Sequence, residues 1–263
     1  MTDTKKNKYG RSLRVTCYGS SSSKTPEAYI EASRELGRAL AEGNHICVNG
    51  GGKTGCMSGM TDGAINAGGK VVGVIHEMFL AGRAECAEDG AHASLLEIVV
   101  TGGPDLQERK KKLVEGCDAI VVMPGGPGTW DELWEMACSK NIGLVSVPIV
   151  VVNTDGFYDN FKHMLKRADS DELLYRKPEE LVHFEDTSEG AVRWIEDEVA
   201  RGSVTKSIFR GINQNSSAIS SALHKIKKSN NAIQNSKWVD RICIFGAGLV
   251  VGISIASRVG IRK

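Results

Sequence analysis

Three apolar segments of this chain each end in a glycine- or serine-rich loop, and this repeat is the feature that most constrains the fold. The loops are Gly19–Ser23, Gly50–Gly55 and Gly125–Thr129, and a helical pattern follows each of them. Alternation of this kind predicts right-handed β-α-β units, which build a parallel sheet covered by helices on both faces. Ligands bind such sheets beyond the carboxyl ends of the strands. We therefore expect an α/β, Rossmann-like doubly wound domain with its ligand site at the three loops.

The expected elements continue this alternation along most of the chain. Residues 76–96 are rich in loops and have no clear assignment. None of the three glycine- or serine-rich loops named above matches the dinucleotide pattern G-x-G-x-x-G or the P-loop pattern G-x-x-x-x-G-K-[ST]. Their sequences therefore disfavour NAD binding and ATP hydrolysis. Strands are expected at 13–18, 45–48, 70–75, 97–101, 119–123 and 147–152, and helices at 26–42, 57–67, 104–117, 130–140, 158–167 and 187–201.

Charge divides the chain into two parts of different character. Residues 203–263 carry a net charge of +9, and the first 202 residues carry −8. The acidic first 202 residues are unsuited to binding nucleic acid, because a phosphate backbone requires a basic surface. We expect a disordered lead-in over residues 1–11, a Rossmann-like domain over 12–202, and a polar basic linker over 203–237.

The last segment, 238–263, contains sixteen consecutive uncharged residues, Ile242–Ser257. A helix of that length spans about 24 Å, short of the roughly 30 Å hydrocarbon core of a membrane. Apolar flanking residues could complete the span, and Gly248-x-x-x-Gly252 suits helix pairing in lipid. We expect an anchor on an intracellular membrane, with residues 12–202 in the cytoplasm; a buried or frayed terminal helix is the alternative.

The seven cysteines are scattered and form no C-x-x-C pair. This spacing favours reduced thiols in a cytosolic protein over a disulfide framework or a zinc site. The polar N-terminus also lacks the apolar core of a signal peptide.

The loop Gly125–Thr129 allows two interpretations. Its glycines let the backbone approach a ligand closely, and the N-terminus of the next helix favours phosphate or another anion. Thr129 and Glu132 also fit a capping box, in which Thr129 caps the helix and Glu132 reaches back to it. Glu132 is thus either a structural capping residue or a catalytic carboxylate.

A second candidate residue is Arg109, in the helical segment that follows Pro104. Leu106, Arg109 and Leu113 share one stripe of this helix, and Leu113 belongs to the side that faces the sheet. Lys111 and Lys112 are expected on the solvated face. An inward arginine near two glycine-rich loops is suited to bidentate binding of phosphate or carboxylate.

The motif Pro124-Gly125-Gly126-x-Gly128-Thr129-x-x-Glu132, together with Arg109-Lys110, resembles the paired signature of the Lonely guy (LOG) family of cytokinin riboside 5′-monophosphate phosphoribohydrolases. The resemblance extends over residues 12–200 or so. It implies a homodimeric Rossmann-like enzyme without metal or cofactor. Such an enzyme hydrolyses the N-glycosidic bond of adenosine 5′-monophosphate or its N6-modified forms, releasing the free base and ribose 5-phosphate.

The resemblance also assigns roles to individual residues. Arg109 and Glu132 would be the catalytic pair, with Glu132 stabilising the oxocarbenium-like transition state or orienting water. Two positions depart from the family pattern: Leu106 replaces a common methionine, and Asp131 replaces a glutamate. The implied substrate-binding residues are Gly19, Ser20, Ser21, Gly51, Gly52, Leu106, Arg109, Lys110, Gly125, Gly126, Pro127, Gly128, Thr129 and Asp131.

Two other functions compete with hydrolysis. The same pocket could hold a nucleotide or a nucleotide-bearing cofactor without cleaving it, although such a carrier has no need for the Arg109–Glu132 pair. Amino-acid decarboxylation would require a pyridoxal-phosphate lysine in a different set of motifs, and the sequence does not show that set.

Overall fold

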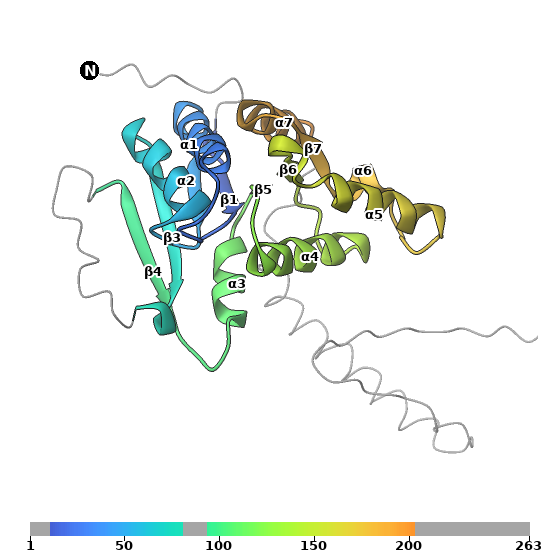
Figure 1. Cartoon of the computed structure of the whole chain (residues 1–263), viewed down its shortest axis with the longest axis horizontal. Helices are drawn as coiled ribbons and strands as arrows, with labels where there is room; N and C mark the ends of the chain where they lie inside the picture. The colour runs from blue at the N-terminus through green and yellow to red at the C-terminus, as the bar shows by residue number, and fades with distance from the viewer. Residues whose placement is uncertain (1–10, 81–93, 203–263) are drawn as a thin grey trace, which may run out of the picture. The chain divides into compact units, whose positions relative to one another are not determined.

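The computed structural model describes residues 11–80 and 94–202, and a seven-stranded, wholly parallel sheet forms their centre (Figure 1). The strand order is β4-β3-β2-β1-β5-β6-β7, so the sequence order reverses at β1. This confirms the expected doubly wound α/β architecture. The strands are β1 Arg14–Tyr18, β2 Ile46–Asn49, β3 Lys70–His76, β4 Leu96–Thr101, β5 Ala119–Val122, β6 Ile149–Val152 and β7 His183–Glu185.

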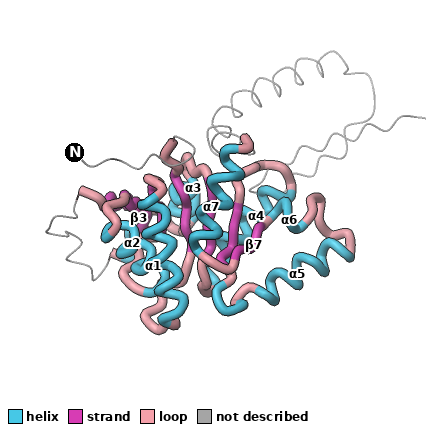
Figure 2. Tube along the Cα trace, turned by 90° about the horizontal axis from the view of Figure 1, so that it is seen from above, coloured by secondary structure: helices cyan, strands magenta, loops and turns pink. Residues whose placement is uncertain are grey.

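The helices cover both faces of the sheet, and the strands lie between the two groups (Figure 2). One face packs against α1, α2 and α7, and the other against α3, α4, α5 and α6. Alternate strand residues supply the two cores, because successive side chains of a strand point to opposite faces. The helices are α1 Glu27–Glu42, α2 Gly55–Asn66, α3 Gln107–Val114, α4 Pro127–Asn141, α5 Asp159–Ser170, α6 Pro178–Leu181 and α7 Ser188–Ala200, and the short 3₁₀ turns are η1 Glu77–Phe79 and η2 Thr154–Gly156.

The switch in strand order brings two of the predicted loops together. β1 pairs with β5 in parallel, with Tyr18 opposite Val122, so both strands end at the same edge. The amide of Ser20 then donates to the carbonyl of Pro124 at 3.0 Å. The loops after β1 and β5 are therefore neighbours, as expected for the ligand crevice of an open α/β sheet.

The structure differs from the predicted elements in several places. Helix α4 begins at Pro127 instead of residue 130, and α3 is confined to Gln107–Val114. Proline at the first helical position starts α4 early, because its missing N–H and fixed φ cost nothing there. The sequence analysis also missed α6 and the edge strand β7, which are too short to show a hydrophobic period.

Several predictions fall outside the described residues. The lead-in over residues 1–10, the linker over 203–237 and the apolar segment over 238–263 all belong to this group. Arg11, the last residue of the expected lead-in, forms an ion pair with Asp118 at 3.1 Å. Within residues 11–80 and 94–202, no helix combines the length and apolar character needed to cross a membrane.

Candidate active site

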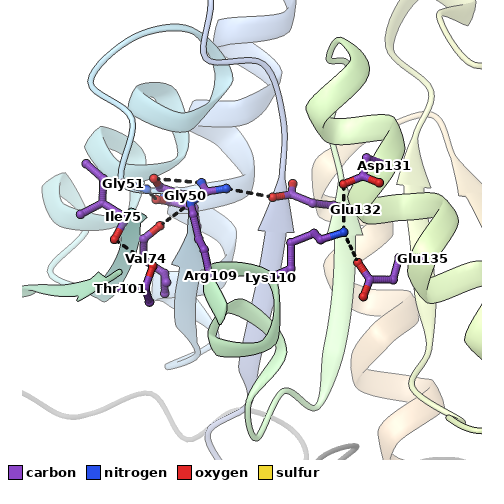
Figure 3. Close-up of polar contacts among 11 residues, drawn as sticks. Gly50, Gly51, Val74, Ile75, Thr101, Arg109, Lys110, Asp131, Glu132 and Glu135 are labelled. Carbon is purple, nitrogen blue, oxygen red and sulfur yellow. Dashed lines mark hydrogen bonds and ion pairs between the residues drawn. The ribbon is translucent and has the colours of Figure 1, made fainter. Parts of the chain in front are cut away.

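Arg109 and Glu132 form a buried ion pair at the carboxyl edge of the sheet (Figure 3). Arg109 Nη1 lies 3.2 Å from Glu132 Oε1. The two residues are only 8% and 7% exposed. Arg109 comes from the start of α3 and Glu132 from α4, so the pair joins two helices on the same face of the sheet.

The capping-box interpretation of Glu132 is wrong. Gly126 is the capping residue of α4, it makes no side-chain capping bond, and Thr129 lies inside the helix. The Glu132 carboxylate points toward Arg109 and accepts a hydrogen bond from it (Figure 3). The structure thus leaves Glu132 free of the competing structural role.

The Arg109 guanidinium is held from three sides. Its Nε donates to the carbonyl of Val74 at 3.0 Å, and its Nη2 donates to the carbonyl of Gly50 at 3.3 Å. A Cβ atom at position 50 would lie 2.2 Å from Nη2, which is too close for two atoms that are not bonded to each other. Glycine at position 50 is therefore required for Arg109 to take this orientation.

Burial raises the pKa of Glu132 to about 7, and the positive charge of Arg109 opposes part of that shift. Neighbouring Asp131 adds a smaller upward contribution to this pKa. A carboxyl group with a pKa near neutrality can both accept and donate a proton under physiological conditions, which is typical of catalytic acids and bases.

A cavity of about 500 Å³ opens beside the pair, within the size range of small-molecule sites. All three predicted loops contribute to its lining, together with the N-terminus of α4. Of the predicted site residues, those that line it are Gly19, Ser20, Ser21, Gly52, Leu106, Arg109, Gly126, Pro127, Gly128, Thr129 and Glu132.

Gly125 and Gly51 are next to this cavity without lining it. A Cβ at position 125 would lie 2.2 Å from Thr129 Oγ1, so glycine allows Thr129 to pack against the loop backbone. Gly51 has a φ of +67°, which favours glycine, and it lines an adjoining cavity of about 280 Å³. Both glycines therefore support the conformation of their loops, although neither lines the 500 Å³ cavity.

Lys110 and Asp131 pair with each other outside the cavity lining. Lys110 Nζ lies 3.2 Å from Asp131 and 2.8 Å from Glu135 (Figure 3). The resemblance placed both residues at the substrate. Neither residue lines the cavity in the structure.

Sequence reasoning missed the apolar part of the cavity. Met57 from α2, Ile75 from the end of β3 and Phe79 from η1 all line it, beside Leu106. Ile75 had a usable signal, because it ends a strand at the edge where ligands bind. Phe79 belongs to the stretch that had no predicted structure, so no pattern pointed to it.

Comparison with known proteins gives one family and consistent relatives. The model of a family described as "Possible lysine decarboxylase" matches residues 57–195. A cytokinin riboside 5′-monophosphate phosphoribohydrolase of Rhodococcoides fascians is 35% identical over 130 residues, covering 49% of this chain and 62% of that protein. The enzyme of the same name, LOG, from Oryza sativa subsp. japonica is 30% identical over 198 residues, covering 72% and 75%.

Solved structures show the same fold at greater distance. The molybdenum cofactor carrier protein of Chlamydomonas reinhardtii superposes with a TM-score of 0.52 and 23% identity, over 72% of this chain and 99% of that protein. A molybdenum cofactor binding protein of Rippkaea orientalis gives a TM-score of 0.51 at 15% identity, over 72% and 98%. At these identities the likeness concerns the fold alone.

Proposed function

The chain belongs to the LOG family of cytokinin riboside 5′-monophosphate phosphoribohydrolases, and on that premise we propose that it hydrolyses adenosine 5′-monophosphates at the N-glycosidic bond. The products are adenine or an N6-modified adenine, and ribose 5-phosphate. The observation that carries this proposal is the buried Arg109–Glu132 pair at the edge of a nucleotide-sized cavity.

Glu132 supports the chemistry of bond cleavage. Breaking the bond between C1′ and N9 passes through a state with oxocarbenium character, which a nearby carboxylate stabilises electrostatically. The same carboxylate can orient the attacking water and accept its proton, because the pKa of Glu132 lies at about 7.

Arg109 supports Glu132 in this role. Burial alone would keep the carboxyl group protonated, and the guanidinium 3.2 Å away favours its anionic form. The carbonyls of Val74 and Gly50 hold the guanidinium in place, so little reorganisation is needed as charge develops.

The rest of the cavity suits a nucleotide. The N-terminus of α4, with Gly128 and Thr129, offers backbone N–H groups to the 5′-phosphate. Met57, Phe79 and Leu106 supply apolar contacts for a purine base. We therefore propose that the phosphate binds at the Gly125–Thr129 loop and the base against the apolar part of the lining.

The direct test is incubation of the purified protein with AMP and with isopentenyladenosine 5′-monophosphate, followed by chromatography of the released base. We expect free base and ribose 5-phosphate in equal amounts. A folded protein that releases base from neither substrate would overturn the proposal.

The alternative function is nucleotide or cofactor binding without hydrolysis. Proteins with this fold include the molybdenum cofactor carriers named above, although the likeness is structural only. Equilibrium binding of AMP by calorimetry, together with a complete lack of base release, would favour a carrier over an enzyme.

Assembly and membrane attachment are further proposals that rest on the sequence. We expect a homodimer, which sedimentation equilibrium of the purified protein would detect.

A C-terminal anchor predicts that the full chain sediments with membranes and that a chain ending at residue 202 does not. Equal partitioning of the two chains would exclude the anchor.

A further inference from the structure

A separate cavity, of about 410 Å³, lies at the opposite edge of the sheet from Arg109 and Glu132. It is bounded by Pro148, just before β6, and by His183, the first residue of β7. It is therefore at the amino ends of these strands, whereas the candidate active site is at the carboxyl ends. The proposed hydrolysis uses none of its residues.

Lys140, in the last turn of α4, lines this cavity and is half-buried. Burial lowers the pKa of Lys140 to about 8; the charge of Arg176 lowers it further, whereas Glu198 and Glu180 oppose the shift. Because an ordinary lysine has a pKa near 10.4, a far larger share of this amine is neutral and nucleophilic at pH 7.5.

The neighbours of Lys140 add the groups that an acyl transfer needs. Arg176 lines the same cavity and contacts Glu180 at 3.7 Å through Nη1. A guanidinium has five N–H donors in a planar fork, so donors remain for an incoming phosphoryl group. Glu180 and Glu198 are carboxylates that can accept a proton.

We propose that Lys140 is a modification site that reacts with small acyl phosphates. The phosphoryl group binds Arg176, and Lys140 Nζ attacks the acyl carbon. The new N–C bond forms as the C–O bond to phosphate breaks, inorganic phosphate leaves, and the proton of Nζ passes to Glu198 or Glu180. The product is a neutral amide at the C-terminal end of the helix that carries Glu132 near its start.

The test uses the full chain with acetyl phosphate at pH 7.5 and follows the acetylation of each lysine by peptide mass spectrometry. Lys24 and Lys166, both exposed, are internal controls. We expect Lys140 to react at least about tenfold faster than either control, because its neutral fraction is larger. Equal rates at the three lysines would overturn the proposal.

A second arm separates phosphate recruitment from simple amine reactivity. Arg176→Gln should slow acetylation of Lys140 by acetyl phosphate severalfold more than its reaction with acetic anhydride, a donor without phosphate. Loss of the Arg176 charge raises the pKa of Lys140 and slows both reactions alike, so the ratio of the two rates isolates phosphate recruitment. Circular dichroism would verify the fold of the variant. Equal slowing with the two donors would refute the role of Arg176 and with it the choice of acyl phosphates as donors.

Discussion

Two ion-pair sites join α3 to α4, and consecutive residues of the two helices supply them. Arg109 and Glu132 are buried and face the cavity, whereas the next lysine, Lys110, contacts Asp131 and Glu135 on the other side. The side chain of Asp131 is 64% exposed, against 8% for that of Glu132. Adjacent helix positions point about 100° apart, so neighbouring residues enter different environments.

The two ion pairs differ in their exposure to solvent as well as in their proposed roles. A half-exposed pair such as Lys110–Asp131 contributes little, because water screens its charges and side-chain entropy opposes it. A buried pair suffers a desolvation penalty, and removing one partner leaves an uncompensated charge. We infer that Lys110 fastens α3 onto α4 while Arg109 and Glu132 carry the reaction, and each prediction below tests that division.

The largest expected effect is that of Glu132→Gln. Loss of the carboxylate should lower kcat by about 10²- to 10⁴-fold, the range for a group that acts in proton transfer or charge stabilisation. Nucleotide binding, measured by calorimetry, should persist. Asp131→Asn is the matched control on the adjacent position and should stay within about twofold of the wild type. Similar losses of kcat in both variants would contradict the proposed difference in role between the two ion pairs.

Gly50→Ala should lower kcat/KM by about tenfold to a hundredfold, since misplacing a catalytic group by about 1 Å can cost that much. The added Cβ would lie 2.2 Å from Arg109 Nη2 and force the guanidinium to move. A double-mutant cycle with Arg109→Ala is the sharper measurement. If Gly50 acts through Arg109, the glycine substitution should cost almost nothing once the arginine is gone; a full additive loss would show an independent effect.

The pH dependence of kcat/KM should report the buried carboxylate. In the proposed mechanism the anionic form of Glu132 is the active one, so kcat/KM should fall about tenfold per pH unit below a pKa of about 7 and level off above it. Asp131→Asn should move this limb to lower pH, because the charge of Asp131 raises the pKa of Glu132. A profile that is flat from pH 5 to 8 would exclude Glu132 as the titrating group.

A smaller effect than those at Glu132 and Gly50 is expected for Lys110→Met, which keeps the length of the side chain and removes its charge. Both ion pairs to α4 are lost, and we expect kcat to fall by about threefold with little change in KM. Lys110→Arg should restore most of the activity. A rise in KM alone would instead indicate direct contact between Lys110 and the substrate.

Local patterns in the sequence were sufficient for most of the architecture. The apolar runs that became β1, β5 and β6 and the helical stripe of Leu106, Arg109 and Leu113 were visible because amphipathic periods are properties of short segments. The edge strand β7 was not, since three half-buried residues have no period. Phe79 was not predicted as a cavity residue for a similar reason, because η1 is a single turn.

The sequence by itself determined the alternation of strands and helices, the three loops at the strand ends, and an inward-facing Arg109. Only the tertiary structure decided what Glu132 faces. Its partner lies 23 residues away, and the carbonyl of Gly50 that holds that partner is 59 residues from Arg109. Hydrogen-bond partners this far apart depend on the order of the strands and on where the helices pack. A capping box and a catalytic pair therefore look alike in the sequence and separate only in the folded protein.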